Sequence, residues 1–332
     1  MILTACVIGD GAMGTLCAAL LARNGLTVRL WGRDAERMSS LQATRCNSQY
    51  LPQLPIPPAV HFTSNAATAC AGAGLVVAAV PCQFLRGVLA LHANAVEQDA
   101  VVVSVVKGIE TGSLRLASEI ISEVLEGRSV VALSGPAIAG EIASGLPATV
   151  VCASRDGHAA RLAQAAFSGP TFRVYTNDDL VGVELAGATK NVIALGAGIL
   201  DGLGMGINCK ASLVTRGLVE ISRLGLALGA RPETFSGLAG LGDLFTTCVS
   251  PTSRNRTAGE RLGRGETLAS VVASARGVVE GVETARSTLA LAKRAGVEMP
   301  IVQAAHAVLF EGVCPRDAIR VLFSRDPKPE WA

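Results

Sequence analysis

Residues 2–14 read ILTACVIGDGAMG, an apolar segment that predicts a β-strand and ends in a G-x-G-x-x-G pattern. A helix-like stretch, 15–23, follows at once. Gly9 permits a tight turn, Gly11 lets the backbone approach a pyrophosphate, and Gly14 lets the helix pack closely on the strand. The free N–H groups of the helix N-terminus would face the phosphates. Because the pattern lies between a strand and a helix, it predicts a dinucleotide site rather than an ordinary glycine-rich turn.

Short apolar segments alternate with amphipathic ones through the first half of the chain. Further strands are expected at 26–31, 75–80, 100–106 and 130–133, and helices at 34–42, 83–94 and 113–126. Such an alternation indicates a parallel sheet that is covered on both faces. Ligands of these sheets bind beyond the carboxyl ends of the strands.

The pattern changes after two more predicted strands, near Val150 and at 172–175. Apolar residues recur at close to helical spacing between 178 and 200, and further helices are expected at 209–229 and 281–296. We therefore expect an α/β protein with an N-terminal, Rossmann-type, doubly wound and mostly parallel sheet in residues 1–180. A C-terminal all-α domain, residues 181–332, would bind the substrate and carry catalysis.

Composition narrows the classes of function. The chain has 332 residues, of which 50% are apolar and 17% charged, enough for two packed domains. A net charge of +2, the lack of a basic block and 4% aromatic residues argue against nucleic-acid binding. Residues 46–85 hold no charged side chain, but prolines break them, and no apolar run reaches the ~18 residues that a membrane span requires. We expect no membrane insertion.

The nine cysteines are scattered, odd in number and without a C-x-x-C pair. A zinc site or a disulfide framework would need clustered cysteines, so reduced thiols in the cytoplasm and no metal site are expected. The apolar N-terminus lacks the basic region of a signal peptide and is interpreted as a strand.

A nicotinamide cofactor transfers only hydride, so a reductase also needs a proton donor. The histidines lie away from the predicted strand ends and are interpreted as surface or packing residues: His61, His92, His158 and His306. Lys190 lies in an apolar helical segment, where burial of its charge is costly unless it faces a cleft or a partner. A lysine that snorkels at the helix edge would fit the same pattern.

Three other segments carry candidate ligand-binding side chains. Lys107 follows a predicted strand, where either a ligand-facing cation or a solvated loop lysine would fit. The segment Ser253-Arg254-Asn255-Arg256 opens a predicted helix, an unfavourable place for cations unless an anion is bound. Asp243 is the one acid in the segment GLGDL, 240–244, and on its own could be a helix N-cap.

Taken together, these segments resemble the bacterial-type NAD(P)-dependent glycerol-3-phosphate dehydrogenase family over essentially the whole chain. The matching motifs are GDGAMGT (9–15), LWGRD (30–34), KGIE (107–110), SGPAIAGEIASGLP (134–147), ATKNVIALGAGILDGLG (188–204), NCKASLVTRGLVE (208–220), GLGDL (240–244), SRNR (253–256) and VVEG (278–281). The resemblance implies reversible reduction of dihydroxyacetone phosphate to sn-glycerol 3-phosphate for glycerophospholipid synthesis. NADP(H) or NAD(H) would be the cofactor, and a homodimer is compatible with the resemblance.

The resemblance also implies roles for individual residues. Lys190 matches the catalytic proton donor and acceptor. The positions matched to substrate binding are Lys107, Gly135, Ala137, Lys190, Asp243, Ser253, Arg254 and Asn255. The positions matched to cofactor binding are Gly9, Gly11, Ala12, Met13, Gly14, Arg33, Lys107, Ala139, Arg254, Val278 and Glu280.

Four positions depart from the family pattern and bear on substrate affinity more than on reaction type. Ala12 and Met13 stand where Ser and an aromatic residue are common, Ala137 where Ser or Thr is usual, and Gly140 where Lys is common. Two alternatives remain: a related two-domain 2- or 3-hydroxyacid dehydrogenase that acts on a carboxylate, and an inactive NAD(P)-binding sensor. The sensor would be expected to lack Lys190 or Asp243, and the chain has both.

The choice between the two cofactors depends on the end of the second predicted strand. An acid there would bind the ribose 2′-hydroxyl of NAD, whereas an arginine accommodates the 2′-phosphate of NADP. Arg33 places a cation at this point, and Asp34 is expected to cap the next helix. The sequence therefore predicts that NADP(H) is accepted at least as well as NAD(H).

Overall fold

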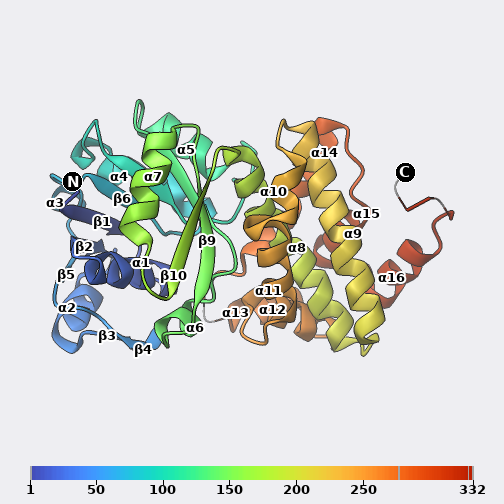
Figure 1. Ribbon diagram of the computed structural model, residues 1–332. Coiled ribbons are helices and arrows are strands. Elements are labelled where there is room, and N and C mark those ends of the chain that lie inside the picture. Colours follow the sequence, from blue (N-terminus) through green and yellow to red (C-terminus); the bar gives the residue numbers. More distant parts are fainter. Residues whose placement is uncertain (1, 276, 328, 331–332) are drawn as a thin grey trace.

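The computed structural model describes residues 2–275, 277–327 and 329–330, which form a sheet-containing half and a helical half side by side (Figure 1). The sheet has eight strands in the order β10-β9-β8-β7-β6-β1-β2-β5. Every neighbouring pair is parallel except β8 and β9. The strands are β1 (Thr4–Ile8), β2 (Thr27–Trp31), β5 (Val60–Thr63), β6 (Leu75–Ala78), β7 (Val101–Ser104), β8 (Val130–Ser134), β9 (Ala148–Ala153) and β10 (Phe172–Asn177).

Helices cover both faces of this sheet, because successive strand residues point to opposite sides and nearly all are apolar. Val7 belongs to a core cluster with Leu16 and Phe167, whereas its neighbour Ile8 belongs to a second cluster with Leu85. The helices of this half are α1 (Ala12–Arg23), α2 (Ala35–Thr44), α3 (Ala66–Ala69), α4 (Cys82–His92), the short 3₁₀ turn at Ala93–Ala95, α5 (Ala117–Val124), α6 (Ala139–Ala143) and α7 (Gly157–Phe167). The predicted doubly wound sheet is confirmed.

The helical half is built around one long buried helix, α8 (Leu180–Gly202). The other elements are α9 (Gly206–Ala227), α10 (Pro232–Ser236), a π-helical turn (Leu238–Gly242), α11 (Asp243–Val249), α12 (Arg254–Gly263), α13 (Leu268–Ala273), α14 (Glu280–Ala295), α15 (Pro300–Phe310) and α16 (Pro315–Phe323). The predicted all-α C-terminal part is confirmed.

Glycines let α8 and α12 approach each other backbone to backbone. A Cβ on Gly198 would overlap the carbonyl oxygen of Arg256, and one on Gly259 would overlap that of Leu195. Any larger side chain at these positions would push the helices apart. The close approach fixes the start of α12 relative to the middle of α8, which is where the candidate site residues lie.

Composition alone would allow α8 to cross a membrane, but 94% of its most apolar 18-residue window is buried inside the protein. Its charged residues also have partners within the fold. Glu184 accepts hydrogen bonds from the backbone N–H of Ser118, at 2.8 Å, and from the Ser118 hydroxyl. Burial raises the pKa of Glu184 to about 7, against the lowering effect of these donors. The contact joins α8 to the start of α5 and so links the two halves.

The structure adds two features that the sequence pattern did not predict. β5 forms the edge of the sheet beside β2, and β3 (Cys46–Asn47) pairs antiparallel with β4 (Leu51–Pro55). Prolines at both ends of the 52–55 segment removed the strand signal, because proline cannot donate to a sheet ladder. The predicted helix 113–126 is shorter, because α5 begins only at Ala117; before it, Leu114 has a φ of 59° and Leu116 forms an isolated antiparallel bridge with Ile109.

Candidate active site

Two segments at the carboxyl edge of the sheet face the middle of α8. Lys107 follows β7, and Gly135 follows β8 with a φ of +129° that favours glycine. The ammonium of Lys107 donates to the carbonyl oxygen of Gly135 at 3.1 Å. The aliphatic part of Lys107 runs over Gly187 of α8, where an added Cβ would lie 3.6 Å from its Cγ. The lysine therefore points from the sheet toward the helical half.

The Asp243 carboxylate bridges two lysines from different halves of the protein. Its Oδ2 lies 2.6 Å from the Nζ of Lys107, and its Oδ1 lies 2.6 Å from the Nζ of Lys190. Lys190 is 5% exposed and Asp243 is 2% exposed. Thr247, one helical turn after Asp243, accepts a hydrogen bond from Lys190 and donates at 2.7 Å to the Asp243 carbonyl. The four residues form a compact charged cluster in an otherwise apolar region.

The charges in this cluster shift the pKa values in a direction that suits proton exchange. Burial, helped by the nearby charge of Lys107, lowers the pKa of Lys190 to about 8, although Asp243 opposes the shift. Burial also opposes ionisation of Asp243, but the two lysines outweigh it and hold its pKa below the usual range. At neutral pH Lys190 is thus protonated yet close to its pKa, as a general acid should be.

These contacts decide two interpretations that the sequence left open. Lys190 does not snorkel at a helix edge, because its side chain is buried and paired with Asp243. Asp243 is not the N-cap of α11; Gly242 holds that position, and Asp243 is the first helical residue. Thr247 was missed, although its place four residues after Asp243 puts both on one helix face.

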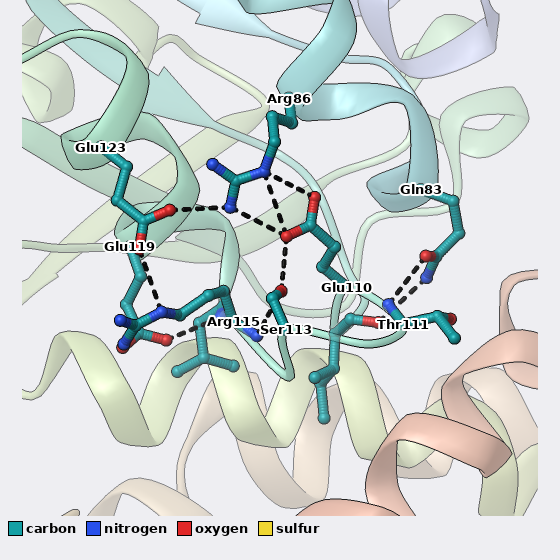
Figure 2. A network of polar contacts seen from close by, with 10 residues as sticks. Gln83, Arg86, Glu110, Thr111, Ser113, Arg115, Glu119 and Glu123 are labelled. Carbon is teal, nitrogen blue, oxygen red and sulfur yellow. Dashed lines mark hydrogen bonds and ion pairs between the residues drawn. The ribbon is translucent and has the colours of Figure 1, made fainter.

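The turn that carries Lys107 is fixed to α4 and α5 (Figure 2). Glu110 forms a bidentate pair with Arg86, whose Nε lies 3.0 Å from Oε1 and whose Nη2 lies 2.9 Å from Oε2. Arg86 also contacts Glu123 of α5 at 2.7 Å. Gln83 brackets the turn by donating to the Ile109 carbonyl and accepting from Thr111 N–H, both at 2.9 Å. Side chains on two helices therefore hold the Lys107 segment in place.

Arg254 and its neighbours form a second group at the start of α12. Ser253 is the N-cap and accepts from the N–H of Arg256 at 3.3 Å. Arg254 is exposed, and its Nη1 donates to the Val278 carbonyl at 3.0 Å. Burial raises the pKa of Glu280 to about 7, while Arg254 opposes the rise. An accessible cation at a helix N-terminus is a favourable place for an anion.

Asn255 links this group to the Lys107 segment through Asn191, a residue that the sequence analysis did not single out. Asn255 donates to the Asn191 side-chain oxygen at 2.9 Å, and Asn191 donates to the Lys107 carbonyl at 3.3 Å. The Asn255 oxygen accepts from the N–H of Gly281 at 2.9 Å. Its amide oxygen and nitrogen are thus both engaged with α8 and α14. In the sequence, only the position of Asn191 next to Lys190 pointed to a role for Asn191.

The glycine loop after β1 has room for a dinucleotide pyrophosphate. Gly9 has a φ of +117°, and a Cβ there would lie 2.6 Å from the Ala79 carbonyl oxygen. A Cβ on Gly14 would overlap the carbonyl of Gly9, whereas one on Gly11 would meet nothing within 4 Å. Gly11 also caps α1 without a side-chain hydrogen bond, so the first N–H groups of the helix are available to an anion. The residues therefore fit a bound dinucleotide.

The remaining predicted cofactor-contacting residues are spread around this loop. Ala12 and Met13 form the first turn of α1, Arg33 is exposed just after β2, and Ala139 is the first residue of α6. Ala137 lies partly buried between β8 and α6. The histidines lie elsewhere: His92, for example, is buried at the end of α4 and contacts the Val88 carbonyl at 2.9 Å. Among the described residues, no group of three or more His, Cys, Asp or Glu could hold a metal ion.

Comparisons with known proteins agree along the chain. Residues 4–160 match the model of the NAD-dependent glycerol-3-phosphate dehydrogenase N-terminus, and residues 179–320 match that of the C-terminus. Two relatives are named glycerol-3-phosphate dehydrogenase [NAD(P)+]. The one of Geobacter sulfurreducens is 48% identical over 327 residues, and the one of Frankia casuarinae is 50% identical over 329 residues. Each alignment covers 98% of this chain and 98% of the relative. A solved glycerol-3-phosphate dehydrogenase of Coxiella burnetii superposes with a TM-score of 0.94 at 34% identity, covering 98% of this chain and 99% of that one.

Proposed function

Because the chain belongs to the NAD-dependent glycerol-3-phosphate dehydrogenase family, we propose that Lys190 exchanges the proton and that Lys107 and Arg254 hold the phosphate in its reaction. The protein is an NAD(P)-dependent oxidoreductase that interconverts dihydroxyacetone phosphate and sn-glycerol 3-phosphate. The observation that carries the proposal is the buried contact of Lys190 with Asp243, beside a second lysine from the sheet.

The proton step follows from the position and pKa of Lys190. The nicotinamide cofactor, when bound, supplies or accepts the hydride at the substrate carbon. As negative charge grows on the carbonyl oxygen during reduction, the Lys190 ammonium stabilises it and then gives up a proton. In oxidation the neutral amine takes the hydroxyl proton. Asp243 and Thr247 hold the nitrogen in place, so that little reorganisation is needed when the charge develops.

Phosphate recognition by Lys107 and Arg254 is supported by their charge and accessibility. Lys107 is the more exposed of the two lysines on Asp243, and Arg254 has no carboxylate partner among the described residues. Two cations from different elements suit a phosphate dianion better than a carboxylate monoanion. This favours the phosphate substrate over the hydroxyacid alternative. Ala137, which has no hydroxyl to donate, leaves more of the binding to the two cations.

We expect Arg254→Ala to raise the KM for dihydroxyacetone phosphate by roughly 30- to 150-fold and to change kcat much less. A charge-assisted contact to a phosphate contributes about 2–3 kcal/mol. Steady-state kinetics with varied dihydroxyacetone phosphate measures the effect. Arg264→Ala is the matched control, since it removes the same charge just after α12, where its partner is Glu260. An unchanged KM in Arg254→Ala would place the phosphate elsewhere, with Lys107 the next residue to test.

We divide the chain into a dinucleotide-binding domain, 1–180, and a substrate-binding and catalytic domain, 181–332. The start of α8 at Leu180 supports this division.

Cytoplasmic localisation is supported by nine free cysteines. A homodimer is compatible with the exposed Val321 and Phe323 of α16.

A further inference from the structure

A carboxylate from the glycine loop lies at the end of β2. Asp10 is the residue between the first two glycines of the loop, and its Cγ would be 3.0 Å from a Cβ on Gly32, the residue that follows β2. In dinucleotide-binding domains the group at this point contacts the adenosine ribose. Position 33, the usual place for that group, carries an arginine in this chain. The carboxylate therefore reaches the ribose position from a different segment.

Arg37, in the first turn of α2, forms an ion pair with this carboxylate. Its guanidinium also donates to the side-chain oxygen of Asn47 at 3.0 Å and to that of Gln49. The same group lies 4.6 Å from the centre of the Tyr50 ring. Asn47 in turn donates to the Asp10 carbonyl at 2.9 Å. The arginine is thus held beside the glycine loop by the β3–β4 hairpin, with about a fifth of its side chain exposed.

Arg33 differs from Arg37 in its exposure and in its lack of partners. It is exposed, and within the described part of the chain it makes no hydrogen bond or ion pair. A free cation of this kind adds positive charge near the ribose but has no fixed geometry. The carboxylate of Asp10 and the guanidinium of Arg37, in contrast, are already oriented. The oriented pair can therefore discriminate more sharply between two ribose substituents than Arg33 can alone.

We propose that Asp10 and Arg37 together let one site accept both nicotinamide dinucleotides. Asp10 accepts a hydrogen bond from the ribose 2′-hydroxyl of NAD(H), as an acid at the end of the second strand does in other Rossmann domains. Arg37 stays beside Asp10 and pairs with the 2′-phosphate of NADP(H) as well, with Arg33 adding charge. An unpaired carboxylate would repel that phosphate, but the arginine neutralises it. The inference rests on the proposed function only in taking a nicotinamide dinucleotide as the ligand.

The test is equilibrium binding of NADH and of NADPH to the purified full-length protein, measured by titration calorimetry without substrate. Asp10→Asn should raise the Kd for NADH about 10-fold and leave the Kd for NADPH unchanged or lower, because a charged acceptor is lost and a negative charge is removed. Arg37→Gln should do the reverse, raising the Kd for NADPH at least 10-fold and that for NADH less than threefold. Opposite shifts of the Kd ratio are the signature of the pair.

Asp34→Asn is the matched control for the loss of negative charge. Asp34 lies two residues after Gly32 and caps α2 by accepting from the N–H of Arg37, a role that asparagine fills equally well. Both Kd values should stay within twofold. Arg33→Ala should weaken NADPH more than NADH, but less than Arg37→Gln does. If Asp10→Asn has a strongly lowered unfolding temperature, Arg37→Gln tests the same ion pair by changing its other member.

Two results would overturn the inference. Equal changes of both Kd values in Asp10→Asn and Arg37→Gln would mean that the pair only shapes the loop. A complete loss of NADPH preference in Arg33→Ala, with Arg37→Gln unaffected, would assign the choice to Arg33 alone. Failure of the wild-type protein to bind either dinucleotide would instead contradict the proposed function. Turnover enters none of these measurements, so the two failures are distinguishable.

Discussion

Lys190→Ala is expected to lower turnover by ~10²–10⁴-fold in both directions, the usual contribution of a general acid or base. The substituted enzyme has no group at the Lys190 position to protonate the carbonyl oxygen or to accept the hydroxyl proton. The affinity for NADH and NADPH should change less than threefold, because most of the residues proposed to bind the dinucleotide lie in the sheet half. Initial rates at saturating substrate, together with direct binding of the dinucleotides, measure the two effects separately.

Two further variants separate the loss of a transferable proton from the loss of positive charge and from effects that removal of any lysine would have. Lys190→Arg keeps a cation but cannot release a proton at neutral pH, so it should recover little activity. Lys293→Ala removes an exposed lysine near the end of α14 and should leave the rate unchanged. If Lys190→Ala instead kept turnover within a few-fold of wild type, the donor would be another group and the mechanism would be wrong.

The pKa of about 8 for Lys190 fixes the direction of the pH dependence. Reduction needs the ammonium form, which is present below this pKa, so kcat/KM for dihydroxyacetone phosphate should fall as the pH rises through about 8. Oxidation needs the neutral amine and should rise through the same range. The limb that Lys190 produces therefore runs in opposite directions in the two profiles, and Lys190→Arg should lose it in both.

The parts of the fold that local sequence determines could be predicted. The glycine loop requires a strand before it and a helix after it within about twenty residues, so its structure followed from Gly9, Gly11 and Gly14, whose contacts with the dinucleotide stay a prediction. The β5 edge strand and the β3–β4 hairpin could not be predicted, because prolines and the lack of strong alternation hide short strands at a sheet edge. Asp34 as a helix cap was predicted from its place before α2, and this is confirmed.

The site itself depends on contacts between residues far apart in the chain. Periodicity placed Lys190 in an apolar helix but could not show that Asp243, 53 residues later, meets its ammonium. The sign of the Lys190 pKa shift likewise depends on the balance between burial, which lowers it, and Asp243, which raises it. Asp10 is a comparable case: its partner Arg37 comes from α2, and only the fold brings the two together.

Asp243→Asn is expected to reduce the rate of reduction at neutral pH on the order of 10²-fold, because the buried ammonium of Lys190 and the half-buried ammonium of Lys107 lose their common counter-charge. The Nζ atoms of Lys107 and Lys190 each lie 2.6 Å from this carboxylate, and an amide of the same shape supplies no negative charge. Without Asp243, burial and the Lys107 charge lower the pKa of Lys190 further. The alkaline limb of the reduction profile should then move to lower pH.

The position of the pH limb separates charge from geometry in Asp243→Asn. At any one pH the equilibrium constant of the reaction does not depend on the enzyme, so kcat/KM should fall by the same factor in both directions. What a lower pKa of Lys190 changes is the pH at which the limb of each profile lies, and both limbs should move to lower pH together. Profiles of kcat/KM against pH in both directions measure this movement. Asp178→Asn, which removes an exposed carboxylate paired with Arg231, should leave both profiles unchanged. A loss of activity with both limbs unmoved would contradict an effect of Asp243 on the Lys190 pKa and leave Asp243 only the role of holding the lysines in place.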